Sequence, residues 1–173
     1  MNTGQTILTI GAFVLLTTIL QGLYNALGNV GSDISSGQDG ILATTIATSY
    51  CESVNRLAFD QITDTSDVAL TTPLLLSYPC GPEAGEDSIA DFNDFDDLNG
   101  YSEVKVAGGS GRSYQTTFTV SYVDEADLST IVPLRTYLKR LDMKTWRIAP
   151  PALSDEIIDT LTTSVVMGYF HFD

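Results

Sequence analysis

The N-terminal part of this chain is almost continuously apolar. Residues 6–27 read TILTIGAFVLLTTILQGLYNAL, in which the polar residues are threonines, Gln21 and Asn25. At about 1.5 Å per residue, a helix of this length spans roughly 33 Å, which is enough to cross the hydrocarbon core of a bilayer. This pattern therefore predicts a hydrophobic N-terminal helix over residues 1–27.

The next stretch, residues 28–40, is rich in glycine. It reads GNVGSDISSGQDG and contains four glycines. In a helix interior each glycine costs about 1 kcal/mol relative to alanine, because its backbone loses more conformational freedom on folding. We therefore expect an extended connector here rather than an uninterrupted helix.

Beyond the connector, from Ile41, apolar residues return at the i, i+3, i+4 and i+7 spacing of an amphipathic helix. The apolar positions are Leu42, Ala43, Ile46, Ala47, Tyr50, Cys51, Val54, Leu57, Ala58 and Ile62. Polar residues such as Thr48, Glu52 and Asn55 fall on the other face. The spacing predicts a second helix that packs one face on a globular core.

Later segments alternate with a period of two, which is typical of half-buried strands. The alternating segments are residues 101–107, 113–122, 137–148 and 160–172. Phe118 and Val120 share one face of the second segment, whereas Val104 and Val106 share one face of the first. Short turns between such strands favour an antiparallel meander.

Together these patterns predict an α+β fold in three parts. A hydrophobic N-terminal helix (residues 1–27) is interrupted by the glycine-rich connector (residues 28–40). An amphipathic helix then packs on a roughly four-stranded antiparallel sheet. We call residues 41–173, which hold this second helix and the sheet, the head.

The distribution of charge supports this division. The sequence has 8 Lys+Arg and 22 Asp+Glu, for a formal net charge of -14, and its first 32 residues contain none of them. Nucleic acid and anionic membrane surfaces are not expected as partners, because both repel a chain with this much negative charge. The chain joins an uncharged apolar segment to a strongly acidic head.

Three interpretations of the apolar segment compete. A cleaved signal peptide begins with a cationic residue and ends in a small-residue site, and residues 1–27 contain neither. A permanent membrane anchor normally carries cationic residues on its cytoplasmic flank, and here the first charged residue is Asp33. The third interpretation is a helix that resides in the membrane and later packs against copies of itself. Thr9, Thr17 and Thr18 suit this helix, since their hydroxyls can bond to carbonyls one turn earlier.

Cys51 and Cys80 are the only two cysteines. In a chain that begins with a membrane segment, an isolated pair predicts a disulfide formed outside the cytoplasm. Closing a loop of about thirty residues would stabilise the fold by roughly 3–4 kcal/mol in the chain-entropy account. The alternative is two unrelated buried thiols.

Residues 83–97 contain seven acidic residues and no cation. Clustered carboxylates are the ligands that Ca²⁺ requires, so Asp91, Asp94, Asp96 and Asp97 are candidate calcium ligands, although their spacing differs from that of an EF-hand. The alternative is a solvated acidic loop held in place by its aromatic residues.

Five of the eight cations lie between residues 135 and 147. An acidic loop and a basic strand region on one subunit favour head-to-tail contacts between copies, with Arg140 and Lys144 as the candidate residues. The alternative is a solvated strand face. The sequence carries no phosphate-binding glycine loop, no Ser-His-Asp set and no dinucleotide fingerprint, so we predict no catalytic residue and no organic cofactor.

The plan of the chain resembles that of type IV pilins and pseudopilins. The features that carry the resemblance are the uncharged helix from Gln5 to Leu27, its continuation ATTIATSYCESVNRLAFDQI, and a small antiparallel sheet with one cysteine pair. The family typically has a glutamate at the fifth mature position, which pairs with the N-terminal amine of a neighbour. If Met1 is the mature terminus, Gln5 occupies that position and can still accept a hydrogen bond from an ammonium group. If cleavage follows Gly4, the fifth residue is Thr9. The favoured assignment is Gln5.

The resemblance implies a helical homopolymer whose subunits wait in the inner membrane until an assembly machinery extracts them. The residues expected at the packed axis are Gln5, Ile10, Phe13, Leu16, Leu20 and Leu23. The favoured hypothesis is the structural subunit of an extracellular pilus-like filament. The alternatives are a single-pass envelope protein with an extracytoplasmic binding domain, and a minor pseudopilin of a secretion or uptake system.

Overall fold

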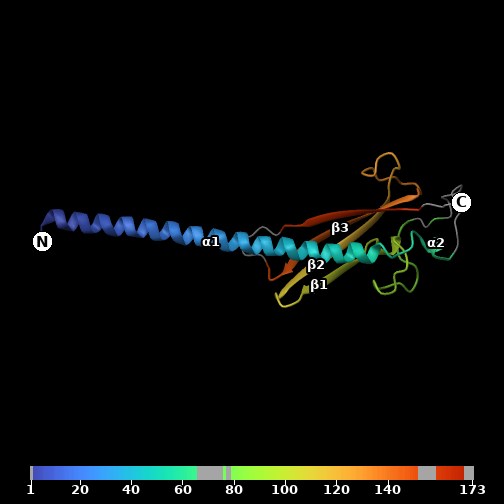
Figure 1. The fold of residues 1–173 in the computed structure, drawn as a ribbon, viewed down its shortest axis with the longest axis horizontal. Coiled ribbons are helices and arrows are strands. Elements are labelled where there is room, and N and C mark those ends of the chain that lie inside the picture. The colour runs from blue at the N-terminus through green and yellow to red at the C-terminus, as the bar shows by residue number, and fades with distance from the viewer. Residues whose placement is uncertain (1, 66–75, 77–78, 152–158, 170–173) are drawn as a thin grey trace. The chain divides into compact units, whose positions relative to one another are not determined.

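The computed structural model describes residues 2–65, 76, 79–151 and 159–169. Its elements in chain order are α1 (Thr3–Val54), α2 (Gln61–Thr65), the 3-10 helix η2 (Asp96–Leu98), β1 (Ser102–Ala107), β2 (Arg112–Tyr122), β3 (Leu138–Ala149) and β4 (Leu161–Gly168) (Figure 1). The chain divides into two compact units, Met1–Asp39 and Gly40–Asp173, and the second contains the head. One long apolar N-terminal helix and a four-stranded antiparallel sheet confirm the α+β layout.

The predicted break at residues 28–40 is wrong, because α1 continues through all of them. None of the four glycines has a positive φ, so each keeps a helical backbone. The stretch contains no proline, the one residue whose ring forces a break by removing a backbone donor. Glycine weakens a helix without preventing its hydrogen bonds, and here that weakening does not end the helix.

In the second unit, α1 packs one face on the sheet. Its buried residues, Ala43, Ala47, Tyr50 and Val54, recur at the spacing of a single helix face. The Tyr50 ring meets the Phe118 ring edge to face, with 4.9 Å between centroids. Tyr50 and Val54 share one hydrophobic cluster with Phe118 of the sheet.

The helix ends at Val54, earlier than the apolar spacing predicts. Past this point the backbone pairs with the acidic loop: Ala58 N donates to Asn93 O (3.1 Å), and Phe95 N donates to Ala58 O (3.0 Å). These bonds form a parallel bridge between Ala58 and Asp94. Because Ala58 pairs with a distant segment, residues 55–60 leave the helix, and the short helix α2 follows.

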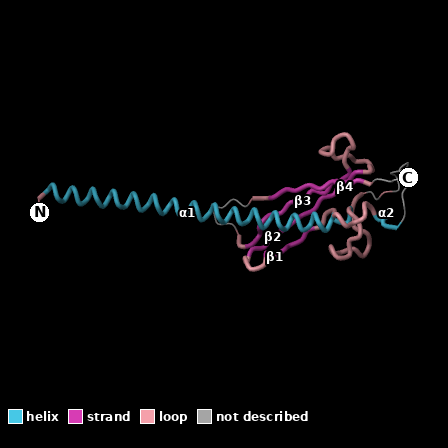
Figure 2. Tube along the Cα trace, viewed as in Figure 1, coloured by secondary structure: helices cyan, strands magenta, loops and turns pink. Residues whose placement is uncertain are grey.

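The sheet is an antiparallel meander in the order β1-β2-β3-β4 (Figure 2). β2 and β3 pair over most of their length, with Phe118 opposite Met143 and Val120 opposite Leu141. All four of these side chains are buried and share one core cluster with residues of α1. The alternation predicted for residues 113–122 is confirmed residue by residue, since β2 buries every second side chain from Tyr114 to Tyr122.

The edge strand β1 turns its polar side toward the helix. Val104 and Val106 remain exposed, at 52% and 69%. On the opposite face, Tyr50 Oη donates to Glu103 Oε2 (2.6 Å), and Lys105 Nζ lies 3.7 Å from the centroid of the Tyr50 ring. The inward positions of β1 are therefore charged, because the helix offers them a phenol rather than an aliphatic surface.

Candidate functional site

The first unit presents apolar side chains to solvent. The large residues predicted for packing are all at least half exposed: Ile10 59%, Phe13 64%, Leu16 51%, Leu20 55% and Leu23 56%. The helix is long and apolar enough to cross a membrane. So much apolar area in water is unfavourable, so lipid or protein must cover this surface in the cell.

Three threonines in the first unit of this helix form hydrogen bonds from their hydroxyls to backbone carbonyls. Thr9 Oγ1 donates to Gln5 O (2.8 Å), Thr17 Oγ1 to Phe13 O (2.7 Å) and Thr18 Oγ1 to Leu15 O (2.8 Å). The back-bonding expected from the sequence is confirmed. Each hydroxyl has a partner within its own helix, so the helix can enter an apolar environment without leaving these donors unpaired.

The cations predicted to form a basic surface differ in their burial and in their contacts. Lys139 and Arg147 are buried on the inner face of β3. Arg140 donates through Nη1 to Leu128 O and Ser129 O, both at 2.9 Å, and its Nη2 lies 3.0 Å from Asp142 Oδ2. Of the two candidate contact residues, Arg140 is therefore engaged within its own subunit, whereas Lys144 is exposed.

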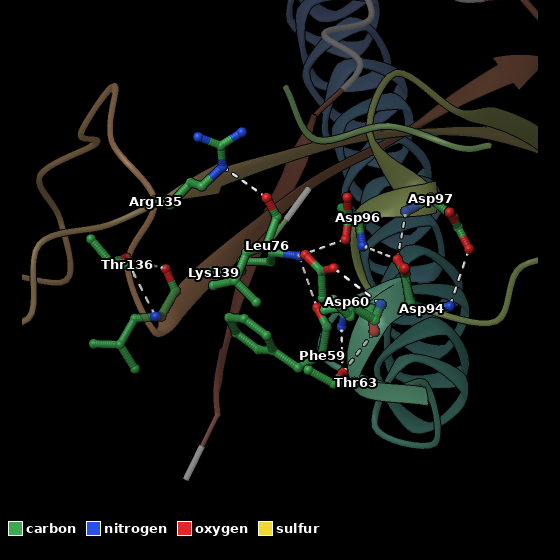
Figure 3. A network of polar contacts seen from close by, with 12 residues as sticks. Phe59, Asp60, Thr63, Leu76, Asp94, Asp96, Asp97, Arg135, Thr136 and Lys139 are labelled. Atoms are coloured by element: carbon green, nitrogen blue, oxygen red, sulfur yellow. Dashed lines mark hydrogen bonds and ion pairs between the residues drawn. The ribbon is translucent and has the colours of Figure 1, made fainter. Parts of the chain in front are cut away.

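A buried ion-pair network centres on Lys139 (Figure 3). Its ammonium lies 2.8 Å from Asp60 Oδ2 and 2.5 Å from Asp96 Oδ1, and it donates to Phe59 O at 2.9 Å. Burial opposes the charge on Lys139, but the carboxylates of Asp96 and Asp60 outweigh it and raise the pKa of the ammonium. Lys139 therefore stays protonated and joins β3 to two segments distant in sequence.

Beside this network lies a second group of acids, which we call the carboxylate cluster: Glu83, Glu86, Asp94 and Asp97. One carboxylate oxygen from each of Glu83, Asp94 and Asp97 lies within 4.8 Å of the others. Glu86 joins them by accepting from Glu83 N (3.0 Å) and from Asn93 Nδ2 (2.8 Å). Asp94 and Asp97 are fully buried, whereas Glu83 reaches the surface.

Within the acidic loop, one carboxylate oxygen of each buried aspartate of the cluster accepts hydrogen bonds from backbone N–H groups. Asp97 Oδ2 accepts from Asn93 N (3.0 Å) and Asp94 N (3.1 Å), and Asp94 Oδ1 accepts from Asp96 N (2.9 Å). Their other oxygens, Asp94 Oδ2 and Asp97 Oδ1, are buried without a hydrogen-bond partner. Such unpaired buried oxygens are costly, so the arrangement calls for a proton or a cation.

Burial and neighbouring charges act on these acids in the same direction. Burial, together with the nearby Asp96 and Asp97, raises the pKa of Asp94 to about 8. Burial and the neighbouring Glu86 carboxylate raise the pKa of Glu83 to about 7. Ionisation of all the carboxylates in the cluster is therefore unfavourable unless a proton or a cation is bound.

The structure changes the set of candidate calcium ligands. Asp91 is exposed, accepts from Ser88 Oγ (2.6 Å), and is not among the three residues whose oxygens converge. Asp96 is held by Lys139. Asp94 and Asp97 do converge, and Glu83 joins them. Sequence reasoning missed Glu83 as a ligand because only the folded loop brings it to two aspartates more than ten residues away.

The predicted disulfide is absent: Cys51 and Cys80 are both free thiols. Both are partly buried and pack against the same hydrophobic cluster, where a thiol behaves as a small apolar group. Burial raises the pKa of Cys80 to about 11, so its thiol stays protonated and a poor nucleophile at neutral pH.

Two free thiols lead to a mass-spectrometric prediction. Alkylation of the denatured chain without reductant is expected to label both cysteines, and prior reduction should add nothing. In the folded protein Cys80 should react slowly, because at pH 8 roughly one thiol in a thousand is ionised at such a pKa. Labels that appear only after reduction would contradict the free-thiol assignment.

Comparison of the chain with protein-family models, with curated proteins and with solved structures found no match. The function is therefore inferred from the chain's own residues.

Proposed function

We propose that this protein is the structural subunit of an extracellular pilus-like filament and that it polymerises through its N-terminal hydrophobic helix. The observation that carries the proposal is the exposed apolar surface of the first unit, together with the absence of any charged residue among the first 32 residues of the chain. Copies of the same helix are suitable partners, because a surface that is apolar all round is complementary to itself.

The energy available from such packing is large. If assembly removes on the order of 2,000 Å² of apolar surface from water, the gain is tens of kcal/mol per subunit at about 25 cal/mol per Å², before the costs of ordering. Gln5, Ile10, Phe13, Leu16, Leu20 and Leu23 are the residues proposed at the axis. The membrane would hold the helix until an inner-membrane assembly machinery moves it into the filament.

The acidic head suits an outer layer. Every acidic residue of the chain lies after residue 32, and only 8 cations offset the 22 acids. Heads arranged around an apolar axis would give the fibre a negative surface. Like charge would keep neighbouring fibres apart and soluble.

The same apolar helix also supports a second candidate, a single-pass envelope protein with an extracytoplasmic binding head. Its basis is that the helix meets the length and composition required to span a bilayer. A minor pseudopilin, present in few copies and forming no long fibres, is a variant of the first proposal.

Shearing of whole cells separates these candidates. A filament subunit is expected in the medium without detergent, as fibres visible by electron microscopy and identified by the mass of the chain. A single-pass protein would stay with the membranes until detergent is added, and that result would contradict the filament proposal. Release of the subunit by shear without detergent, but with only short fibres or none, would instead indicate a minor pseudopilin.

Filaments held by apolar burial are expected to resist salt. At about 1 M NaCl the Debye length falls to roughly 3 Å, so contacts made by charge pairing weaken strongly, while apolar packing does not. Purified filaments should therefore sediment equally at low and high salt. Disassembly at high salt would show that charge contacts between heads, rather than the helix, hold the subunits together.

A further inference from the structure

We propose that the head binds one Ca²⁺ ion at Glu83, Asp94 and Asp97, with Glu86 at the rim of the site. Ca²⁺ binds oxygen ligands at about 2.3–2.6 Å, so two oxygens on one ion lie at most about 5 Å apart. The three ligand oxygens lie within 4.8 Å of one another and meet that limit. The site lies wholly within the second unit and does not depend on filament formation.

The unpaired oxygens are the independent sign of a ligand. Asp94 and Asp97 are each 0% exposed, and each keeps one oxygen, Oδ2 and Oδ1 respectively, that no donor reaches. The other oxygen of each is fixed by backbone N–H groups of the loop, so both carboxylates are held in place before any ion arrives. Asn93 Oδ1 is also buried without a partner and could add a neutral ligand.

The local charge balance favours a cation. Among the described residues of the head, four aspartates are buried, Asp60, Asp94, Asp96 and Asp97, and the buried Lys139 forms ion pairs with Asp60 and Asp96. Within the part of the chain that the structure describes, no lysine or arginine forms an ion pair with Asp94, Asp97 or Glu83. A divalent cation would neutralise the two aspartates that the lysine does not reach.

The donor set selects the kind of cation. It consists of oxygen atoms alone, with no imidazole or thiolate, and therefore favours a hard cation over zinc or copper. Mg²⁺ requires compact octahedral geometry near 2.0–2.1 Å and gives up its waters reluctantly, whereas Ca²⁺ accepts irregular cages of six to eight oxygens. Glu83 is exposed and Glu86 is partly exposed, so this side of the cluster is accessible to solvent.

The test uses the full-length chain in detergent, with thermal unfolding and calorimetric titration by CaCl₂ after treatment with a chelator. At about 100 times the dissociation constant, Ca²⁺ is expected to raise the Tm of the head by roughly 5–10 °C. An equal concentration of MgCl₂ should shift the Tm much less.

Two variants and a matched control assign the ligands. Asp97→Asn keeps an oxygen for the loop N–H groups but replaces the free oxygen by an amide donor, so Ca²⁺ affinity should fall by at least about tenfold. Glu83→Gln, at an exposed position where folding is not at stake, should also weaken binding about tenfold. Asp91→Asn removes one charge from the same loop outside the cluster and should leave the Ca²⁺-dependent shift intact.

The proposal is overturned if wild-type protein shows no binding heat and the same Tm in about 10 mM CaCl₂ as in chelator, a concentration well above that needed by weak extracellular sites. It is equally overturned if Mg²⁺ stabilises as strongly, because that indicates diffuse neutralisation of an acidic surface. Loss of the shift in Asp91→Asn, with retention in Glu83→Gln, would also reject this ligand set.

Discussion

Lys139→Met is expected to lower the free energy of unfolding of the head by about 3–5 kcal/mol. Methionine fills a similar volume but carries no charge, so Asp60 and Asp96 would stay buried, 1% and 0% exposed, without the ammonium that now pairs with both. Phe59 O would lose the same donor. Urea unfolding of the full-length chain in detergent and chelator, followed by tryptophan fluorescence, measures the change.

Two further variants show whether orphaned charge is the cause. Combining Lys139→Met with Asp60→Asn and Asp96→Asn removes all three charges and should restore much of the lost stability. Arg140→Met, at the next position of β3 on the outer face, should cost less than about 1 kcal/mol because its ion pair is partly exposed. If Arg140→Met is as damaging as Lys139→Met, the buried network is not what distinguishes position 139.

If the protein polymerises as proposed, Leu16→Lys is expected to abolish filament formation. Leu16 lies in the middle of the apolar stretch, and its side chain is 51% exposed. A lysine at the centre of a membrane helix costs roughly 2.5–3.5 kcal/mol, and a helical polymer would repeat that charge once per subunit along its axis. Electron microscopy and immunoblotting of sheared material would measure the loss.

Two controls separate this effect from general damage. Leu16→Met keeps an apolar side chain of similar volume and should assemble normally. Thr119→Lys adds the same charge on the exposed face of β2 and should also assemble. Membrane extraction at high pH shows whether Leu16→Lys still inserts. Normal fibres from Leu16→Lys would rule out the N-terminal helix as the packed axis.

Sequence pattern alone predicted the parts of the fold that depend on neighbouring residues. The apolar run that contains Leu16 specifies a helix, and the alternation from Tyr114 to Tyr122 specifies both a strand and its buried face. Periodicity is a local property, so the residues that create it are read directly from the chain. Periodicity did not predict which face of β1 packs inward, because the charged face of that strand contacts Tyr50.

Residues 28–40 show the limit of predicting a helix break from glycine's low helix propensity. Glycine content predicted a break at residues 28–40, yet α1 continues through them. A penalty of about 1 kcal/mol per glycine is a bias rather than a prohibition, and no proline is present to enforce the break. The helix ends instead at Val54, shortly before Ala58 exchanges backbone bonds with residues 93 and 95, a pairing that no local rule anticipates.

The sequence by itself determined that this protein joins an uncharged apolar helix to an acidic α+β head, because composition and period are local. Only the tertiary structure decided which acids meet. It assigned Asp96 to Lys139, turned Asp91 to solvent, and brought Glu83 to Asp94 and Asp97. It also left Cys51 and Cys80 as separate thiols against one core. Such partnerships depend on long-range backbone pairing, and the identity of the residues does not specify them until that pairing has formed.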